Sequence, residues 1–384
     1  MRQVGVFRHN LFRLSEPFVT QQAGFLQRYH PLYMGRLRYG PSPSGADVLA
    51  LEDLAPHMRL LPAAWHMISA SPHPYLYSLG GQRLDLIHAH FGVEGVYALK
   101  LADKLNIPLV TTFHGFDATL GTMGLLSNPA WARYALQRGR LAKRGAVFLA
   151  ASKFLRDKLL ALDFPPERVL VHYIGVDTRA IMPRSFAQEE AVILHVARLE
   201  EVKGTEWVIR AFAQIAPQHG TAQLVIIGEG KLRKRLQRLA QETGFADRVS
   251  FLGARPHAEV LQWMQYAAMV VLASVRTQSG REEGLGLVLL EGAASGVPGI
   301  GTRVGGISEG IVEGETGFLV PERDVESLSI AMGTLLANPP LRQRMGAAAR
   351  VRVEQLFDIR RQTAYLEDIY DALLGGAEVS SSLG

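Results

Sequence analysis

Short runs of apolar, often β-branched residues alternate along this chain with segments whose apolar residues have helical spacing. In the first half the predicted strands are 3–8, 32–37, 84–89, 107–113, 146–151 and 168–173. The helices predicted between them are 16–28, 93–105, 129–143 and 153–162. Such alternation is typical of parallel sheets that helices cover on both faces.

A polar segment at residues 177–190, which includes Pro183, breaks the alternation and is predicted to be a linker. The strands predicted after it are 191–199, 222–228, 249–253, 269–274 and 317–320. The helices predicted there are one that starts at Thr205 and those at 231–242, 257–267, 287–295, 324–336, 339–356 and 358–374. Two such series in 384 residues predict an α/β protein with two Rossmann-like domains, 1–178 and 179–357, facing each other across a cleft.

Composition excludes several classes of chemistry. The chain contains no cysteine, so disulfides, thiolate metal ligands and cysteine nucleophiles are excluded. The N-terminus has no apolar signal-peptide core, and no run approaches the ~20 apolar residues of a membrane-spanning helix. We therefore expect a cytoplasmic protein, either free or peripheral on the inner face of the membrane.

Positive charge is concentrated in the first half of the chain. Residues 1–180 carry 20 Lys and Arg against 12 Asp and Glu, whereas residues 181–384 carry 21 against 24. Eight of the cations fall within 131–158. This bias suggests an anionic partner such as a membrane face or an acidic acceptor, although a solvated helix face explains the same pattern. Without a recognisable nucleic-acid-reading motif, nucleic acid is not expected as a partner.

The segment EEGLGLVLLEGAASGVPGIGTRVGG (282–306) combines many glycines with an apolar run and two glutamates. It follows a predicted strand that ends at Ser274. The turn and the start of the next helix are Gly284, Leu285, Gly286 and Leu287. A glycine-rich turn into a helix N-terminus can bind an anion through unpaired backbone N–H groups.

Glu283 and Glu291 flank this turn and change its interpretation. Carboxylates repel phosphate, but they accept hydrogen bonds from the hydroxyls of a sugar or ribose. The combination therefore predicts a nucleotide-sugar site with its diphosphate on the glycine turn. Taken singly, each glutamate also fits a helix-capping or surface role.

The spacing of the two glutamates, with EGLG and GVP around them, resembles the signature of retaining glycosyltransferases of family 4. Further segments follow in that family's order: VARLEEVKG (196–204), IGEGKLRKRL (227–236), VSFLGARPHAEVLQWMQYAAMVVLAS (249–274) and GETGFLV (314–320). The first half contributes LDLIHAHFG (84–92), IPLVTTFHGFD (107–117), ASKFLRDKL (151–159) and VHYIGVD (171–177). SEPFVTQQAGFL (15–26) resembles the start of exopolysaccharide and colanic-acid-type members. Many other members carry a GG-containing turn after the first strand, and this sequence does not.

The resemblance implies a GT-B fold in which the C-terminal domain holds most of the donor and the N-terminal domain binds the acceptor. It also implies that the last helix, 358–375, returns to the N-terminal domain. We expect residues 376–384 to form a disordered tail.

The resemblance also assigns roles to individual residues. Arg198 and Lys203 would neutralise the diphosphate leaving group, which is electrostatic catalysis. Glu283 would bind hydroxyls of the donor sugar, and Glu291 those of the ribose. His114, at the end of a strand, would face the reacting sugar. The other implied donor-binding residues are Gly228, Gly230, Ser274, Gly284, Leu285, Gly286 and Leu287. The residues implied near the acceptor or cleft are Ser15, Glu16, His90, Gly115 and Asp117.

Four residues carry more specific expectations. Asp117 is expected either to position His114 or to line the acceptor site. We expect His88 and His90 to face opposite sides of their strand, with His90 toward the cleft and His88 in packing. His195, in an apolar strand, is expected in the core.

The implied reaction is retaining transfer of a hexose from a nucleotide diphosphate-sugar to a glycan or lipid-linked glycan, in cell-surface or exopolysaccharide synthesis. A UDP-hexose is the first choice of donor and GDP-mannose the second. The sequence contains no DxD motif, so we expect no metal requirement, and no cofactor is implied. An epimerase of the same fold and a silent nucleotide-sugar-binding subunit stay open. A dinucleotide-dependent oxidoreductase is disfavoured because no GxGxxG follows a strand.

Overall fold

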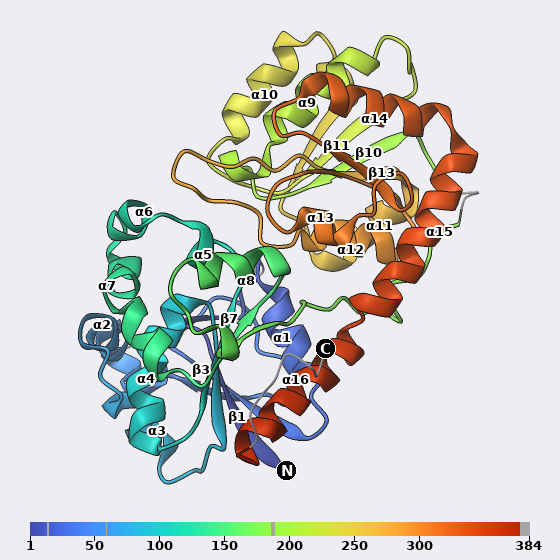
Figure 1. Cartoon of the computed structure of the whole chain (residues 1–384). Helices are drawn as coiled ribbons and strands as arrows, with labels where there is room; N and C mark the ends of the chain where they lie inside the picture. The colour runs from blue at the N-terminus through green and yellow to red at the C-terminus, as the bar shows by residue number, and fades with distance from the viewer. Residues whose placement is uncertain (14, 59, 186–188, 377–384) are drawn as a thin grey trace. The chain divides into compact units, whose positions relative to one another are not determined.

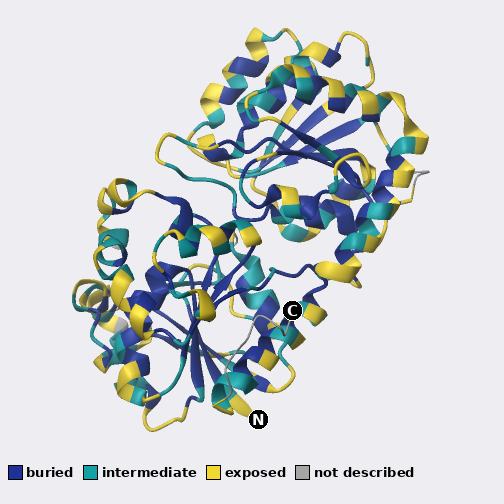
Figure 2. Cartoon of the chain, in the orientation of Figure 1, coloured by how far each residue is buried: buried dark blue, intermediate teal, exposed yellow. Residues whose placement is uncertain are grey.

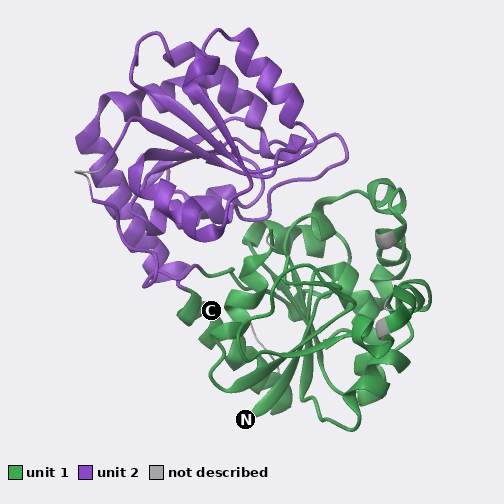
Figure 3. Cartoon of the chain, turned by 180° about the vertical axis from the view of Figure 1, so that it is seen from behind, with its two compact units in different colours: residues 1–175, 359–384 green, residues 176–358 purple. Residues whose placement is uncertain are grey.

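The computed structural model describes residues 1–13, 15–58, 60–185 and 189–376 and divides the chain into two compact units. One unit comprises Met1–Gly175 and the chain from Ile359 onward, and the other is Val176–Asp358 (Figure 3). The chain passes from one unit to the other after Gly175 and again after Asp358. The boundaries predicted from the sequence, after residues 178 and 357, lie three residues and one residue away from these two points. The predicted tail from 377 onward and part of the predicted linker, 186–188, lie outside the described residues.

The first unit contains a parallel sheet that has seven strands in the described part of the chain, in the order β5-β3-β1-β6-β7-β8-β9 (Figure 1). These strands are β1 (Arg2–Phe7), β3 (Tyr29–Gly35), β5 (Asp47–Ala50), β6 (Leu86–His90), β7 (Leu109–Phe113), β8 (Val147–Ala150) and β9 (Val169–Val171). A separate short pair is formed by β2 (Asn10–Leu11) and β4 (Leu37–Arg38). The helices are α1 (Pro17–Gly24), α2 (Leu60–Ser69), α3 (His73–Leu79), α4 (Gly92–Leu105), α5 (Phe116–Thr119), α6 (Thr122–Leu126), α7 (Pro129–Arg144), α8 (Lys153–Leu160) and α16 (Ile359–Leu374).

Helix α16 completes the core of this unit. Its side chains Leu366, Ile369 and Tyr370 lie in one cluster with Val4 of β1 and Leu86 of β6. The central strands β6 and β7 are buried along their whole length, as expected for a sheet covered on both faces. The expected return of the last helix to the N-terminal unit is therefore confirmed.

The second unit contains a parallel sheet in the order β12-β11-β10-β13-β14-β15. Its strands are β10 (Val192–Val196), β11 (Gln223–Ile227), β12 (Val249–Gly253), β13 (Ala267–Leu272), β14 (Gly299–Thr302) and β15 (Gly317–Val320). Its helices are α9 (Thr205–Ile215), α10 (Arg233–Glu242), α11 (His257–Tyr266), α12 (Leu287–Ala294), α13 (Ile307–Gly310), α14 (Val325–Ala337) and α15 (Pro339–Leu356).

Alternation along β10 shows why this sheet needs helices on both faces. Ile193 packs in a cluster with residues of α9 and α14, whereas Val192 and Leu194 pack in a second cluster with residues of α11 and α12. Successive side chains of a strand point to opposite faces, so a continuous apolar run is buried on both (Figure 2).

The strand order positions the functional residues in both units. Numbered along the chain, each sheet reads 3-2-1-4-5-6 across its first six strands, so the order reverses between β10 and β13 in one and between β1 and β6 in the other. Ligands of such sheets bind beyond the carboxyl ends of the strands at this reversal. In the described part of the chain, no helix is long and apolar enough to cross a bilayer.

Candidate functional site

Lys203 and Glu283 form the centre of the candidate donor site in the second unit, beside the ends of β10 and β13. Lys203 Nζ lies 2.5 Å from Glu283 Oε2, and the Ser274 hydroxyl donates to the same oxygen over 3.2 Å. Both charged side chains are mostly buried. Burial alone would raise the pKa of Glu283, but Lys203, Ser274 and Arg281 outweigh it, and the pKa is lowered. The carboxylate is therefore ionised at neutral pH.

Gly204 brings Lys203 to this place. Its φ of +64° belongs to the left-handed region, and a Cβ on it would lie 1.7 Å from the carbonyl oxygen of Ala273. The backbone that follows β10 therefore touches the backbone that follows β13. A side chain at this position would separate Lys203 from Ser274 and Glu283.

Glycines of the segment 282–306 let the backbone approach Glu283 closely, as Gly204 lets it approach Ala273. A Cβ on Gly305 would lie 1.9 Å from the carbonyl oxygen of Glu283, and the Gly306 N–H donates to that oxygen over 3.1 Å. Gly286, with φ of +82°, is the N-cap residue of α12. The glycines thus let two backbone segments meet and let the chain turn into the helix.

Arg198 lies in a second charged cluster in the loop after β10. Its guanidinium is about half exposed and pairs with Glu200 at 3.1 Å, and Arg281 pairs with the other oxygen of Glu200 at 2.8 Å. One carboxylate therefore holds two guanidinium groups. The sequence did not single out Glu200 or Arg281, because their partnership spans 81 residues of chain.

Gly228 and Gly230 support this loop from the neighbouring strand. Added Cβ atoms would lie 1.9 Å from the carbonyl oxygen of Ala197 and 2.4 Å from that of Leu199, on either side of Arg198. The Leu199 N–H also donates to the carbonyl of Glu229 over 2.8 Å. In the structure these glycines allow two loops to cross, which positions Arg198.

Glu291 faces His257 from inside α12. His257 Nε2 lies 2.8 Å from Glu291 Oε1, and the hydrogen bond to this carboxylate raises the pKa of His257 against the effect of burial. His257 is the first residue of α11, in a segment that the family resemblance covers without assigning it a role. No local signal in the sequence marks it as the partner of Glu291.

In the first unit, Asp117 holds the loop that carries His114. Its buried carboxylate accepts hydrogen bonds from the backbone N–H groups of Gly92 (2.8 Å), Gly115 (2.9 Å) and His114 (3.3 Å). Burial raises the pKa of Asp117 to about 6, against the lowering effect of these bonds. Of the two expected roles, the structure fits positioning of His114, through its backbone. At 1 % exposure the carboxylate offers no surface to an acceptor.

His88 and His90 lie on the same face of β6, so the expectation that they face opposite sides was wrong. Their rings are stacked with centroids 4.4 Å apart, and the His90 ring lies nearly parallel to the His114 ring with centroids 5.3 Å apart. Residues two apart in a strand share a face, because only successive side chains alternate. His195 is buried as expected, and it bonds to the carbonyl of Val271 and the hydroxyl of Thr205, each at 2.9 Å.

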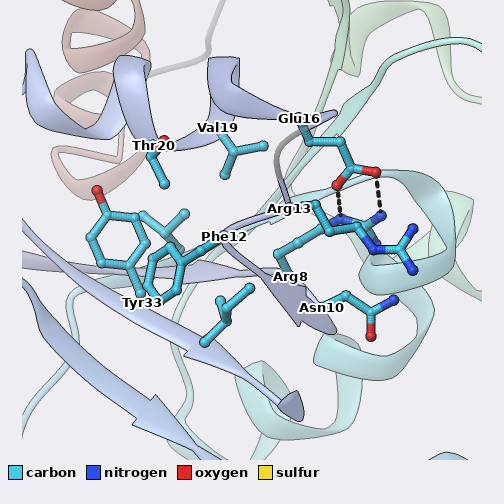
Figure 4. Close-up of a pocket in the computed structure, with 10 residues that line it drawn as sticks. Arg8, Asn10, Phe12, Arg13, Glu16, Val19, Thr20 and Tyr33 are labelled. Atoms are coloured by element: carbon cyan, nitrogen blue, oxygen red, sulfur yellow. Dashed lines mark hydrogen bonds and ion pairs between the residues drawn. The ribbon is translucent and has the colours of Figure 1, made fainter. Parts of the chain in front are cut away.

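Glu16 is tied to the end of β1, whereas Ser15 is exposed. The Glu16 carboxylate pairs with the Arg8 guanidinium through two bonds of 2.9 and 3.0 Å, beside a small pocket lined also by Asn10 and Arg13 (Figure 4). Arg8 also pairs with the buried Glu94 and lies 4.4 Å from the centroid of the Phe91 ring. Arg8 is a further charged residue that the sequence did not indicate.

The expected site residues thus form two groups, one in each unit. The donor group comprises Arg198, Lys203, Gly228, Gly230, Ser274, Glu283, Gly284, Leu285, Gly286, Leu287 and Glu291. The other group comprises Ser15, Glu16, His90, His114, Gly115 and Asp117. Each group lies at or beyond the carboxyl ends of the strands in the sheet of its own unit.

Comparison with known proteins gives a consistent family. The model "Glycosyltransferase Family 4" matches residues 30–180, and the model "Glycosyl transferases group 1" matches residues 177–352. The chain is 30 % identical over 302 residues to N-acetyl-alpha-D-glucosaminyl L-malate synthase of Bacillus anthracis, covering 75 % of each chain. It is 31 % identical over 249 residues to a putative colanic acid biosynthesis glycosyltransferase, WcaL, of Salmonella typhimurium, covering 64 % of this chain and 60 % of that one.

A solved structure gives the same fold. The structure of Anabaena HepE in complex with UDP-glucose superposes with a TM-score of 0.72 at 21 % identity, over 96 % of this chain and 99 % of HepE. The backbones of the two proteins superpose although their sequences have diverged, and this similarity supports the two Rossmann-like units. The matches to both halves and the 30 % identity to the Bacillus anthracis relative show that the chain belongs to the glycosyltransferases of family 4, and the structural similarity shows that it has the GT-B fold.

Proposed function

We propose that the protein transfers a hexose, with retention of configuration, from a nucleotide diphosphate-sugar to a glycan or lipid-linked glycan acceptor. The observation that carries this proposal is the ionised Glu283 between Lys203 and Ser274, with Arg198 in the same loop as Lys203. A carboxylate accepts bonds from sugar hydroxyls, and the two cations suit a diphosphate.

In the proposed reaction the bond between C1 of the sugar and the β-phosphate oxygen breaks. A new bond forms between C1 and the acceptor oxygen on the same face, and the leaving phosphate takes the acceptor proton. Arg198 and Lys203 stabilise the negative charge that develops on the diphosphate, which is an electrostatic contribution. We propose further that Glu291 binds the ribose, that His114 contacts the transferred sugar, and that no metal is needed, since the chain has no DxD motif.

A UDP-hexose is the proposed donor, with GDP-mannose as the alternative. HepE, with the same fold, is solved with UDP-glucose, and the relative WcaL is named for colanic acid biosynthesis. These names support synthesis of an exopolysaccharide or another cell-surface glycan as the process.

A thermal-shift screen against UDP, GDP, ADP and their common sugar conjugates, with EDTA present, tests the donor. A ligand that binds only the native state raises the midpoint of unfolding. We expect one nucleotide family to do so in wild type and not in Glu291→Ala. Nucleotide release that needs an acceptor would support transfer. Turnover without one would favour the epimerase, and binding without turnover would favour a silent subunit.

A membrane-bound acceptor is supported by the surface of α2. Its exposed apolar side chains are Leu60, Leu61, Trp65, Met67 and Ile68. Helix α7 adjoins the end of α2, because Arg133 donates to the carbonyl of Ile68, and α7 carries most of the basic cluster. Exposed apolar side chains beside cations suit an anionic lipid surface.

Sedimentation with phosphatidylglycerol vesicles tests this association. We expect the wild-type protein to sediment with the vesicles at low salt, and to do so less at high salt or with the substitution Trp65→Ser. Wild type that stays in the supernatant would contradict the association.

A further inference from the structure

We propose that His90 is a positioning residue that fixes His114 in one tautomer and leaves Nδ1 as its working atom. We also propose that Tyr370 of α16 helps to fix His90, because it holds the His88 ring on which His90 stacks. This inference rests on the proposed function, in which His114 contacts the transferred sugar.

The rings of the three histidines lie in a row across two strands. His90 lies between His88, at 4.4 Å and 25° between ring planes, and His114, at 5.3 Å and 14°. His90 Nδ1 lies 3.1 Å from His114 Nε2, which is hydrogen-bonding distance. Phe18 and Phe91 pack against the His114 ring, at 4.7 and 4.6 Å, so this ring is confined on several sides.

The contact between His90 and His114 limits where the imidazole hydrogens can lie. Burial, followed by the neighbouring charges, lowers the pKa of all three histidines well below the usual value. In a neutral pair only one hydrogen lies between His90 Nδ1 and His114 Nε2. Since that bond occupies Nε2, the tautomer of His114 is set by which ring carries the shared hydrogen.

The other nitrogen of His114 is left for a ligand. Within the described residues, His114 Nδ1 is buried and has no hydrogen-bond partner. A buried polar atom without a partner costs free energy, so such an atom calls for an explanation. A hydroxyl of the transferred sugar is the partner that the proposed function supplies.

Tyr370 links the stack to the last helix. His88 Nδ1 lies 2.5 Å from the Tyr370 hydroxyl, and His88 Nε2 lies 2.6 Å from the Thr112 hydroxyl. Both nitrogens of His88 are therefore bonded, and its ring cannot turn without breaking a bond. Because His90 stacks on this fixed ring, α16 contributes to the position of His114 although it is distant in sequence.

Two substitutions of His90 separate the effect of its hydrogen bond to His114 from the effect of its stacking on His88. His90→Phe keeps a ring but removes Nδ1, and His90→Asn keeps a polar group near Nδ1 but removes the ring. We expect kcat to fall about 10- to 100-fold in His90→Phe, with KM for the donor changed less than about 3-fold, because loss of His90 Nδ1 leaves the partly buried His114 Nε2 without its partner. His90→Asn should recover at least about half of the lost factor on a logarithmic scale.

Imidazole 15N–1H correlation spectra provide the readout that a purely structural role would not move. In wild type we expect His114 in a single neutral tautomer, and in His90→Phe a changed tautomer or a mixture. His30→Asn, at an exposed histidine paired with the exposed Asp47, is the control and should leave kcat unchanged. Tyr370→Phe, which removes one hydroxyl, should shift the His88 resonances and lower kcat less than His90→Phe.

A mixture of His114 tautomers in wild type, or full kcat in a folded His90→Phe, would overturn the proposal. Should His90→Phe not fold by thermal melting, failure of Tyr370→Phe to move the His88 resonances would overturn it. The spectra need no substrate. Lack of turnover with every nucleotide sugar would thus contradict the proposed function alone, while a tautomer mixture in an active enzyme would contradict the positioning role alone.

Discussion

The ammonium group of Lys203 lies 2.5 Å from the Glu283 carboxylate, although 80 residues of chain separate them. The pair brings the loop after β10 to the loop after β13. For the proposed donor this means that the diphosphate would meet a cation that a carboxylate already neutralises in part. Phosphate and sugar hydroxyls would then share the two partners.

Lys203→Ala should therefore reduce donor turnover strongly. We expect kcat to fall about 10²- to 10³-fold, the usual cost of removing one stabilising group from a developing anion. The control is Lys231→Ala, at an exposed lysine in the loop that follows β11. Steady-state kinetics with the nucleotide sugar identified by the thermal-shift screen provides the measurement, and turnover equal to the control would contradict the role.

The same pair predicts how stability depends on pH. The pKa of Glu283 is lower in the folded state than its ordinary value of 4.5, so its stabilising effect is complete above pH 4.5 and is lost as the pH falls through the folded pKa. Urea unfolding of wild type and Glu283→Gln should differ most at pH 7 and converge at acid pH. A difference that grows toward acid pH would have the wrong sign.

The pair His257–Glu291 predicts the opposite dependence. The pKa of His257 is raised in the folded state, so its contribution is present below 6.5 and is lost as the pH rises through the folded pKa. Glu291→Gln should therefore lower the free energy of unfolding more at pH 5.5 than at pH 8.5. Chemical denaturation at both values measures this, and equal effects would show that the two side chains are not coupled.

Asp117→Ala should destabilise the first unit. Removal of the carboxylate leaves the backbone N–H groups of Gly92, Gly115 and His114 without their acceptor. The first two bonds are buried and the third is partly buried, and each buried group left unpaired costs about 1–3 kcal/mol. We expect a loss of at least about 2 kcal/mol in the free energy of unfolding, together with a broadened His114 resonance. Asp47→Ala, at an exposed carboxylate, is the matched control. A loss no larger than in that control would contradict the assigned role.

Gly204→Ala should displace Lys203. The added Cβ would overlap the carbonyl oxygen of Ala273, whereas Ala at Gly244, where φ is +78° and nothing lies within 4 Å, brings only backbone strain. We expect Gly244→Ala to cost about 1 kcal/mol and Gly204→Ala clearly more, with loss of donor binding. Thermal melting with and without nucleotide measures both. Similar midpoints and equal binding would show that the two backbones do not meet.

Much of the fold follows from local pattern. The predicted strand at 249–253 and helix at 339–356 agree with β12 and α15 residue for residue, because apolar spacing and caps such as Asn338 are local signals. Strands β5 and β14 and helices α2 and α3 were not predicted. β14 reads GIGT, in which alternate glycines hide a strand that only its neighbours β13 and β15 stabilise.

Local patterns in the chain are enough to predict the two α/β halves, the family and the residue types of the donor group, since these rest on periodicity and on motifs of adjacent residues. The fold is what brings distant polar side chains together: Lys203 with Glu283, Glu291 with His257, and His90 with His114. It also decided that several glycines serve as crossings between backbone segments. Contacts between residues far apart in the chain depend on the order and register of strands, which no local window of sequence encodes.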